Sequence, residues 1–350
     1  MRVVVLGASG NAGSALLRAL ESEERVEDVV AVARRPPNEW LSSKTTWQAV
    51  DIATDALEPV VRGADAVVHL AWLIQPSRDQ ERCYAVNVTG SRRVLEAVAA
   101  ARVPALVYAS SVGAYSRGPK DRRVDETWPT GGVPSSFYSR HKVEVERLLD
   151  GFEVQRPDVR VVRLRPALIF QRGAGSEIRR LFAGPFLPSP LISPKRIPIV
   201  PRHPRLRFQA VHADDVADAY RRAIVGDVRG AFNVAADPIL DGEELGRLLG
   251  AQPIPVPASA LRAGAAAAFH ARLTPTPPGW VDMAFSVPLM DTARARDALG
   301  WKPRRDAGSA LLELLEAIRT SAGSPTPTLA PGSGARSRAR EILSGLGSRQ

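Results

Sequence analysis

The sequence has little cysteine and no long hydrophobic run. Cys83 is the only cysteine among 350 residues, which excludes an intramolecular disulfide and a cysteine-rich metal site, and we predict no metal. No segment approaches the roughly 20 apolar residues that span a bilayer, and the apolar run at residues 3–6 is too short for a secretory signal. We therefore expect a cytoplasmic protein that does not contact membranes.

The charge pattern argues against nucleic-acid binding. The formal net charge is +10, but the 47 basic residues are scattered along the whole chain, and three of the ten net charges fall in the C-terminal tail. A basic stripe with interleaved aromatic residues is typical of nucleic-acid binding proteins, and this sequence has none. We expect a small-molecule substrate rather than a nucleic acid.

The first half of the chain alternates short apolar runs with helical patterns. A hydrophobic content of 45% is enough for a sizeable core. Alternation of this kind predicts an α/β fold with a doubly wound parallel sheet of the Rossmann type. The predicted strands are 3–6, 29–32, 66–70, 106–109 and 159–164, and the predicted helices are 12–20, 56–61, 86–100 and 135–149.

Beyond residue 170 the alternation breaks down. We predict that residues 1–170 form mainly the dinucleotide-binding core and that 171–319 form mainly a smaller substrate-binding lobe, with 208–235 returning to the core. Residues 173–204 are dense in Pro, Gly and Arg, which favours a loop-rich lid. The Ser/Pro/Gly/Thr-rich segment 320–350 is predicted to be a disordered tail.

A glycine-rich loop follows the first predicted strand. Glycines at this point let the backbone turn tightly and approach a pyrophosphate, which the start of the next helix attracts. Such a loop also serves mononucleotides or simply closes a turn, so it is weak evidence alone. The loop residues that we predict to hold a dinucleotide are Gly7, Ser9, Gly10, Asn11 and Gly13.

The end of the second strand favours NADP(H). An NAD enzyme usually has an acidic residue there for the ribose 2′-hydroxyl, but this chain has Ala33 followed by Arg34 and Arg35. Guanidinium groups suit a 2′-phosphate, although both arginines could be solvated loop residues, so NAD(H) stays open. Further cofactor contacts are predicted at the ends of two later strands, from Asp51, Ile52, Leu70 and Ala71.

Tyr138 and Lys142 stand four residues apart on a predicted helix, and therefore share one face. An ammonium group near a phenol favours the phenolate and lowers the phenol's pKa. The pair predicts an acid/base group that works near neutral pH. Alternatively, the two are a surface Tyr and a solvated Lys.

These motifs resemble the extended short-chain dehydrogenase/reductase family, the NAD-dependent epimerase/dehydratase-like proteins, over roughly residues 1–319. The resemblance implies that Tyr138 is the proton donor or acceptor, that Ser111 hydrogen-bonds the substrate oxygen, and that Lys142 binds the nicotinamide ribose. It also implies a place near the active site for Asn87, which could equally be a helix cap. Other marks are Val68-His69-Leu70-Ala71, Asn87-Val88-Thr89-Gly90, Ser110-Ser111-Val112-Gly113-Ala114-Tyr115, Arg165-Pro166 and Val211-His212-Ala213-Asp214-Asp215-Val216.

Three functions follow as hypotheses. The first is an NADP(H)-dependent oxidoreductase that acts on a carbonyl or alcohol, with Trp72, Leu73 and Ile74 as apolar pocket walls. The second is a nucleotide-sugar epimerase or dehydratase that retains NAD, for which Arg205 and Arg207 could hold a diphosphate. The third is a non-catalytic dinucleotide sensor. Relatives of this branch are often dimers, so a homodimer is also an expectation.

Overall fold

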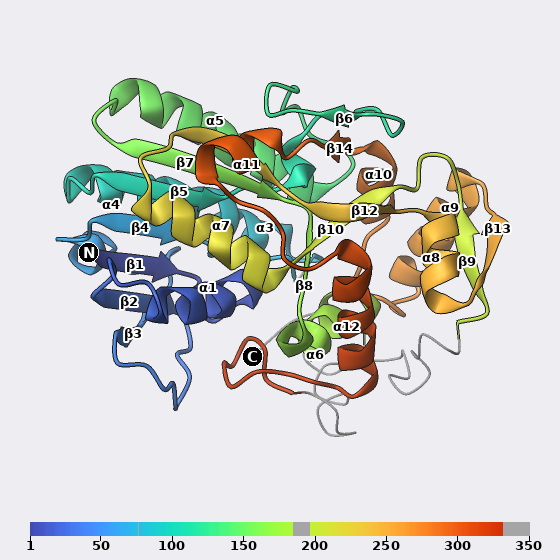
Figure 1. The fold of residues 1–350 in the computed structure, drawn as a ribbon, viewed down its shortest axis with the longest axis horizontal. Helices are drawn as coiled ribbons and strands as arrows, with labels where there is room; N and C mark the ends of the chain where they lie inside the picture. The colour runs from blue at the N-terminus through green and yellow to red at the C-terminus, as the bar shows by residue number, and fades with distance from the viewer. Residues whose placement is uncertain (76, 185–196, 332–350) are drawn as a thin grey trace.

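A seven-stranded parallel sheet forms the centre of the molecule (Figure 1). The computed structural model describes residues 1–75, 77–184 and 197–331. The strand order is β11-β7-β5-β4-β1-β2-β3, which confirms the doubly wound fold. The strands are β1 (Arg2–Leu6), β2 (Asp28–Ala33), β3 (Thr45–Ala49), β4 (Ala66–His69), β5 (Ala105–Ala109), β7 (Arg160–Pro166) and β11 (Gly230–Val234).

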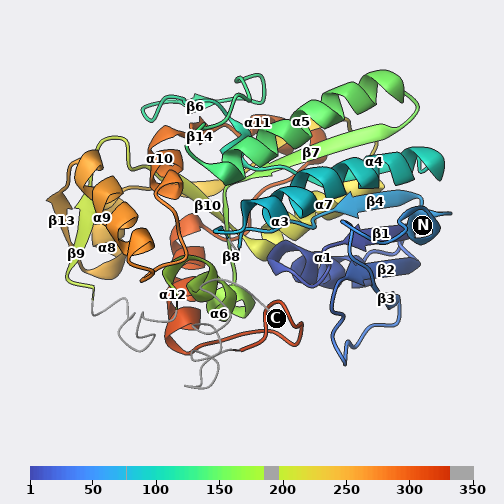
Figure 2. The ribbon, with the colours of Figure 1, turned by 180° about the vertical axis from the view of Figure 1, so that it is seen from behind.

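Helices cover both faces of this sheet (Figures 1 and 2). Val3 and Val5 of β1 pack with the helices of one face, whereas Val4 and Leu6 pack with those of the other, which explains why β1 is apolar throughout. The first face carries α1 (Asn11–Glu21), α7 (Ala213–Val225) and α11 (Ala293–Leu299). The second face carries α2 (Glu58–Val61), α4 (Gly90–Ala100) and α5 (Phe137–Gln155), and α3 (Gln80–Tyr84) reaches α4 through a π-helical turn at Ala85–Thr89.

The chain order reverses between β1 and β4. The strands β1, β2 and β3 run toward one edge of the sheet, and β4, β5 and β7 run toward the other. In open parallel sheets, ligands bind beyond the carboxyl ends of the strands at such a reversal. The fold therefore places a binding crevice at the ends of β1 and β4.

A second region lies beside the sheet and consists of small sheets and helices. Its three-stranded sheet has β8 (Leu168–Phe170), β10 (Phe208–His212) and β12 (Ala236–Leu240), and α12 (Ala307–Arg319) packs on it. Two further pairs are β9 (Ile199–Arg202) with β13 (Gln252–Pro255), and β6 (Arg123–Val124) with β14 (Leu289–Met290). The remaining helices are α6 (Gly175–Ile178), α8 (Gly242–Leu249), α9 (Ala258–His270) and α10 (Gly279–Ser286).

Two expectations for this region differ from the structure. The segment 208–235, predicted to return to the core, is divided, because β10 joins the small sheet while α7 and β11 join the core. The predicted lid is not all loop, since Arg172–Ala174, Gly175–Ile178 and Arg179–Ala183 are 3₁₀, α- and π-helical. Residues 185–196 of that prediction lie outside the described residues.

The predicted disordered tail also differs over its first part. Residues 320–331 pack against the body of the protein, with Thr326 and Leu329 fully buried. The Ser/Pro/Gly/Thr-rich composition does not reveal this packing, because one leucine and two threonine hydroxyls are enough to anchor a short turn. The rest of the predicted tail, 332–350, lies outside the described residues.

Candidate active site

A cavity of about 620 Å³ opens at the reversal point of the sheet. It extends from the glycine loop after β1 to Tyr138 on α5. All the predicted site residues line it except Asn87. They are Gly7, Ser9, Gly10, Asn11, Gly13, Arg34, Arg35, Asp51, Ile52, Leu70, Ala71, Ser111, Tyr138 and Lys142.

Backbone atoms approach the glycine loop so closely that a side chain would not fit at two of its positions. Gly7 has φ +86°, and a Cβ there would lie 2.5 Å from the Ala71 nitrogen. A Cβ on Gly13 would lie 2.5 Å from the Gly7 carbonyl oxygen. Gly10 precedes α1 without a capping side chain, and the first turn of α1 has no acidic residue. This cradle fits the pyrophosphate of a dinucleotide, because the start of a helix attracts an anion.

The cavity edge at the end of β2 carries exposed cationic groups. Arg34 and Arg35 follow β2 and are both solvent-exposed at the cavity edge. Asp51 also lines the cavity, and its Oδ1 accepts a hydrogen bond from the Ala53 nitrogen at 2.9 Å. This edge of the cavity therefore presents the guanidinium groups of Arg34 and Arg35 beside the Asp51 carboxylate.

Tyr138 lies in the first turn of α5 and faces Ser111. The helix begins after Ser136, whose hydroxyl accepts from the Ser139 nitrogen. Ser111 precedes a 3₁₀ turn at Val112–Ala114, and its Oγ accepts from the Gly113 nitrogen at 3.0 Å. Burial raises the pKa of Tyr138 to about 12, and a hydrogen bond with Ser111 opposes the rise. The phenol is therefore protonated at neutral pH.

Lys142 lies in the second turn of α5, deeply buried. Its Nζ donates to the Ala109 carbonyl at 2.6 Å and lies 3.5 Å from the centre of the Trp72 ring. Burial holds the pKa of Lys142 well below its ordinary value, and Glu146 opposes this. The predicted lowering of the Tyr138 pKa by Lys142 is not found: the pKa is raised, and Ser111 is the group that moderates it.

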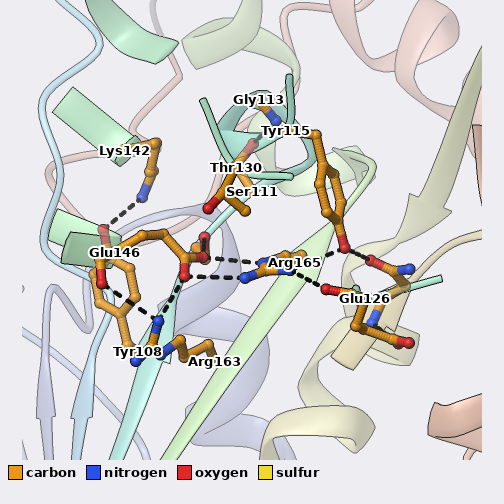
Figure 3. Close-up of polar contacts among 12 residues, drawn as sticks. Tyr108, Ser111, Gly113, Tyr115, Glu126, Thr130, Lys142, Glu146, Arg163 and Arg165 are labelled. Atoms are coloured by element: carbon orange, nitrogen blue, oxygen red, sulfur yellow. Dashed lines mark hydrogen bonds and ion pairs between the residues drawn. The ribbon is translucent and has the colours of Figure 1, made fainter. Parts of the chain in front are cut away.

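A buried ion network lies beneath these residues (Figure 3). Glu146, one turn after Lys142 on α5, accepts hydrogen bonds from Arg165 (3.0 Å), Arg163 (2.9 Å) and Ser110 (2.5 Å). Arg165 also donates to the Tyr115 hydroxyl. The network ties α5 to β7 and to the end of β5, and so fixes the elements that carry Ser111 and Lys142. Sequence reasoning missed Glu146, although its spacing four residues after Lys142 put it on the same helix face.

Asn87 does not line the cavity. Its Oδ1 accepts from the Leu73 nitrogen at 2.7 Å, its Nδ2 donates to the Leu73 carbonyl at 2.8 Å, and Nδ2 lies 3.4 Å from Nδ1 of His141. The side chain therefore fixes the backbone that follows β4. It acts neither as a helix cap nor as a direct contact to the cavity.

Aromatic side chains surround Tyr138. Its ring lies 4.9 Å from that of Trp280 and 5.9 Å from that of Trp72, and Phe182 lies edge-on to Trp280 at 5.0 Å. Trp72, Leu73 and Ile74 line the cavity, as predicted from the sequence. Trp280 and Phe182 were missed, because they come from distant segments that carry no motif.

The arginines considered for a diphosphate bind backbone instead. Arg205 donates to the carbonyls of Phe285 and Gly118, both at 3.0 Å, and Arg207 donates to that of Lys120 at 2.6 Å. Neither arginine lines the cavity. Both therefore serve the packing of the second region.

The fold and the site together define a Rossmann-type protein with a dinucleotide site. The chain belongs to the NAD dependent epimerase/dehydratase family, whose model matches residues 3–235. This confirms the resemblance drawn from the sequence motifs. Similar proteins include a dehydrogenase and an epimerase solved with NAD.

Similar proteins differ in their activities. An uncharacterized protein of Mycobacterium tuberculosis is 29% identical over 92% of this chain, which spans only 31% of that relative. The decarboxylating sterol-4-alpha-carboxylate 3-dehydrogenase of Saccharomyces cerevisiae is 30% identical over 49% of this chain and 52% of its own length. The UDP-glucose 4-epimerase of Thermus thermophilus, solved with NAD, shares the fold at 21% identity with a TM-score of 0.67, covering 92% of this chain and all of its own.

Among the described helices, none is long and apolar enough to cross a membrane. Within the same part of the chain, no group of three or more His, Cys, Asp or Glu residues could hold a metal ion.

Proposed function

We propose that this protein is an NADP(H)-dependent oxidoreductase that reduces a carbonyl group of an apolar substrate or oxidises the matching alcohol. The observation that carries the proposal is that Ser111, Tyr138 and Lys142 meet in one cavity, between the glycine cradle and an aromatic wall. The bound nicotinamide would supply or accept the hydride.

The chain's own residues would handle the proton. Tyr138, whose phenol is protonated at neutral pH, can donate its hydroxyl proton to a carbonyl oxygen that gains negative charge. Ser111 can donate a hydrogen bond to the same oxygen. Lys142 would hold the nicotinamide ribose. In the reductive direction Tyr138 acts as an acid, and in the oxidative direction its phenolate would act as a base.

The cofactor ends are assigned by charge and shape. Gly7, Gly10 and Gly13 would hold the pyrophosphate, and the exposed guanidinium groups of Arg34 and Arg35 would hold a 2′-phosphate. The positive charges of Arg34 and Arg35 support NADP(H) over NAD(H).

The aromatic wall supports an apolar substrate. Trp72, Phe182 and Trp280 bring three rings to the Tyr138 side of the cavity, and planar rings bind apolar ligands by area and by ring contacts. Arg205 and Arg207, the two arginines considered for a sugar-nucleotide diphosphate, donate to backbone carbonyls instead. The yeast sterol dehydrogenase relative points in the same direction.

A titration with NADPH and NADH, followed by a substrate panel, tests this function. We expect preferential binding of NADPH and its stoichiometric oxidation with apolar cyclic ketones. Turnover of UDP-sugars with a retained NAD, and no net cofactor consumption, would replace the proposal with an epimerase or dehydratase. Nucleotide binding without turnover of either substrate class would favour a sensor.

Replacing Tyr138 tests the proton-transfer role. Tyr138→Phe removes one hydroxyl, so kcat should fall by about 10²- to 10⁴-fold while NADPH affinity stays near that of the wild type. Tyr84→Phe is a matched control, because the Tyr84 hydroxyl bonds Glu144 outside the cavity. Full turnover in Tyr138→Phe would refute the mechanism.

A further inference from the structure

The chain after α12 turns back toward the glycine loop. Residues 320–331 pass α6, where the Ser176 hydroxyl donates to the Ser321 carbonyl at 2.9 Å and the Ser176 nitrogen donates to the Ala322 carbonyl at 2.9 Å (Figure 1). The Ala322 nitrogen donates back to Ala317 at 2.7 Å. We call residues 321–331 the strap. The start of the strap is therefore fixed to two helices, α6 and α12.

The strap forms a tight turn of its own. The Ser324 nitrogen donates to the Leu329 carbonyl at 2.9 Å, and the Leu329 nitrogen donates to the Thr326 carbonyl at 3.0 Å. A Cβ on Gly323 would lie 2.4 Å from the Leu329 carbonyl oxygen, so this packing requires glycine. With Thr326 and Leu329 fully buried, the turn has a defined shape.

Two threonine hydroxyls connect the strap to the dinucleotide cradle. Thr326 Oγ1 donates to the Ser9 carbonyl at 2.8 Å, and Thr328 Oγ1 lies 2.8 Å from Ser9 Oγ. Ser9 lies between Gly7 and Gly10, and Thr328 itself lines the cavity. A residue more than 300 positions away in the sequence thus takes part in the glycine-loop site.

We propose that Thr328 is a cofactor-binding residue, and that the strap closes over the pyrophosphate of the dinucleotide and slows its release. A hydroxyl has one donor and two acceptor positions, so the Ser9–Thr328 pair can keep its mutual bond through one proton and offer the other proton to a phosphate oxygen. The donors already stand beside the start of α1, where an anion is favoured. The inference rests on the proposed dinucleotide cofactor.

Conservative variants of the full chain separate binding from packing. Thr328→Val keeps the shape and removes the hydroxyl, and Thr328→Ser restores it. Thr320→Val is the matched control, since the Thr320 hydroxyl bonds Glu316 and Ala317 on the surface end of α12. The measurements are NADPH affinity by calorimetry, the NADPH release rate in a chase with excess NADP⁺, and the melting temperature of nucleotide-free protein.

We expect Thr328→Val to weaken NADPH binding about tenfold, as loss of one charge-assisted hydrogen bond predicts, mainly through faster release. Thr328→Ser and Thr320→Val should match the wild type, and nucleotide-free melting should not change. Wild-type affinity in Thr328→Val overturns the inference, as does a joint loss of affinity and melting temperature that serine does not restore. Failure of the wild type to bind either NADPH or NADH would instead refute the proposed cofactor.

Discussion

Glu146 is a buried, ion-paired residue whose replacement should lower the stability of the fold. Its carboxylate is completely inaccessible to solvent and contacts two arginines that are themselves less than 10% exposed. Burial alone raises the pKa of Glu146, but hydrogen bonds and charge from Arg165 and Arg163 lower it overall, from 4.5 to about 2. A difference of one pKa unit between the folded and unfolded states is worth about 1.4 kcal/mol, so the lowered pKa of Glu146 corresponds to about 3 kcal/mol of folding free energy at pH 7.

The substitution Glu146→Gln keeps the size of the side chain and removes its charge. We expect the free energy of unfolding at pH 7 to fall by about 3 kcal/mol, because two guanidinium groups lose their shared buried anion. For a protein of this size, the melting temperature should drop by roughly 4 °C. Urea unfolding and calorimetry measure both quantities.

The pH dependence gives an independent check. Because the folded-state pKa is depressed, the stabilisation is fully present above about pH 5 and is lost as the pH falls toward 2. The difference between wild type and Glu146→Gln should therefore shrink over that range. Glu58→Gln serves as a control, since the Glu58–Arg62 pair is exposed and its loss should be barely measurable. A variant as stable as the wild type at pH 7, with no convergence in acid, would refute the reasoning.

Two further predictions concern the cofactor end of the cavity. Replacing Arg34 and Arg35 together by alanine should reduce the ratio of NADPH to NADH affinity about tenfold or more, because the 2′-phosphate loses charge-assisted hydrogen bonds; an unchanged ratio in paired titrations would contradict their assignment. Gly13→Ala should abolish nucleotide binding and destabilise the fold by about 1–3 kcal/mol, since its Cβ would meet backbone at 2.5 Å. The control Gly151→Ala, on α5 with open space around it, should instead stabilise by about 0.5–1 kcal/mol; equal effects in thermal melts would reject the steric argument.

Local patterns predicted the parts of the site that are continuous in sequence. The strand–glycine loop–helix unit at Gly7–Gly13 and the Tyr138/Lys142 spacing each depend on a few neighbouring residues, so their geometry follows from strand and helix periods. The same logic placed Arg34 and Arg35 at the end of β2, where the structure has them.

The parts that were missed depend on contacts between distant segments. Trp280 meets Tyr138 across some 140 residues, and Thr328 meets Ser9 across 319. The sequence around Trp280 and Thr328 shows no pattern that would indicate these contacts, because the contacts form only when distant segments of the chain come together. The misjudged protonation of Tyr138 has a similar cause, since burial could not be inferred from the Tyr-x-x-x-Lys spacing alone.

The Glu146 network also constrains how this sequence can change over generations. Arg163 and Arg165 point from the same side of β7 to a single carboxylate. Removing only Glu146 takes away the carboxylate that Arg165 contacts, although Arg163 keeps Asp150 and Glu153, and removing one arginine leaves the acid with the other arginine and Ser110. An apolar replacement of all three residues is often tolerated in other proteins, but every intermediate on the way is penalised. We therefore expect homologues to keep Glu146, Arg163 and Arg165 together or to replace all three, while the surrounding apolar positions vary more freely.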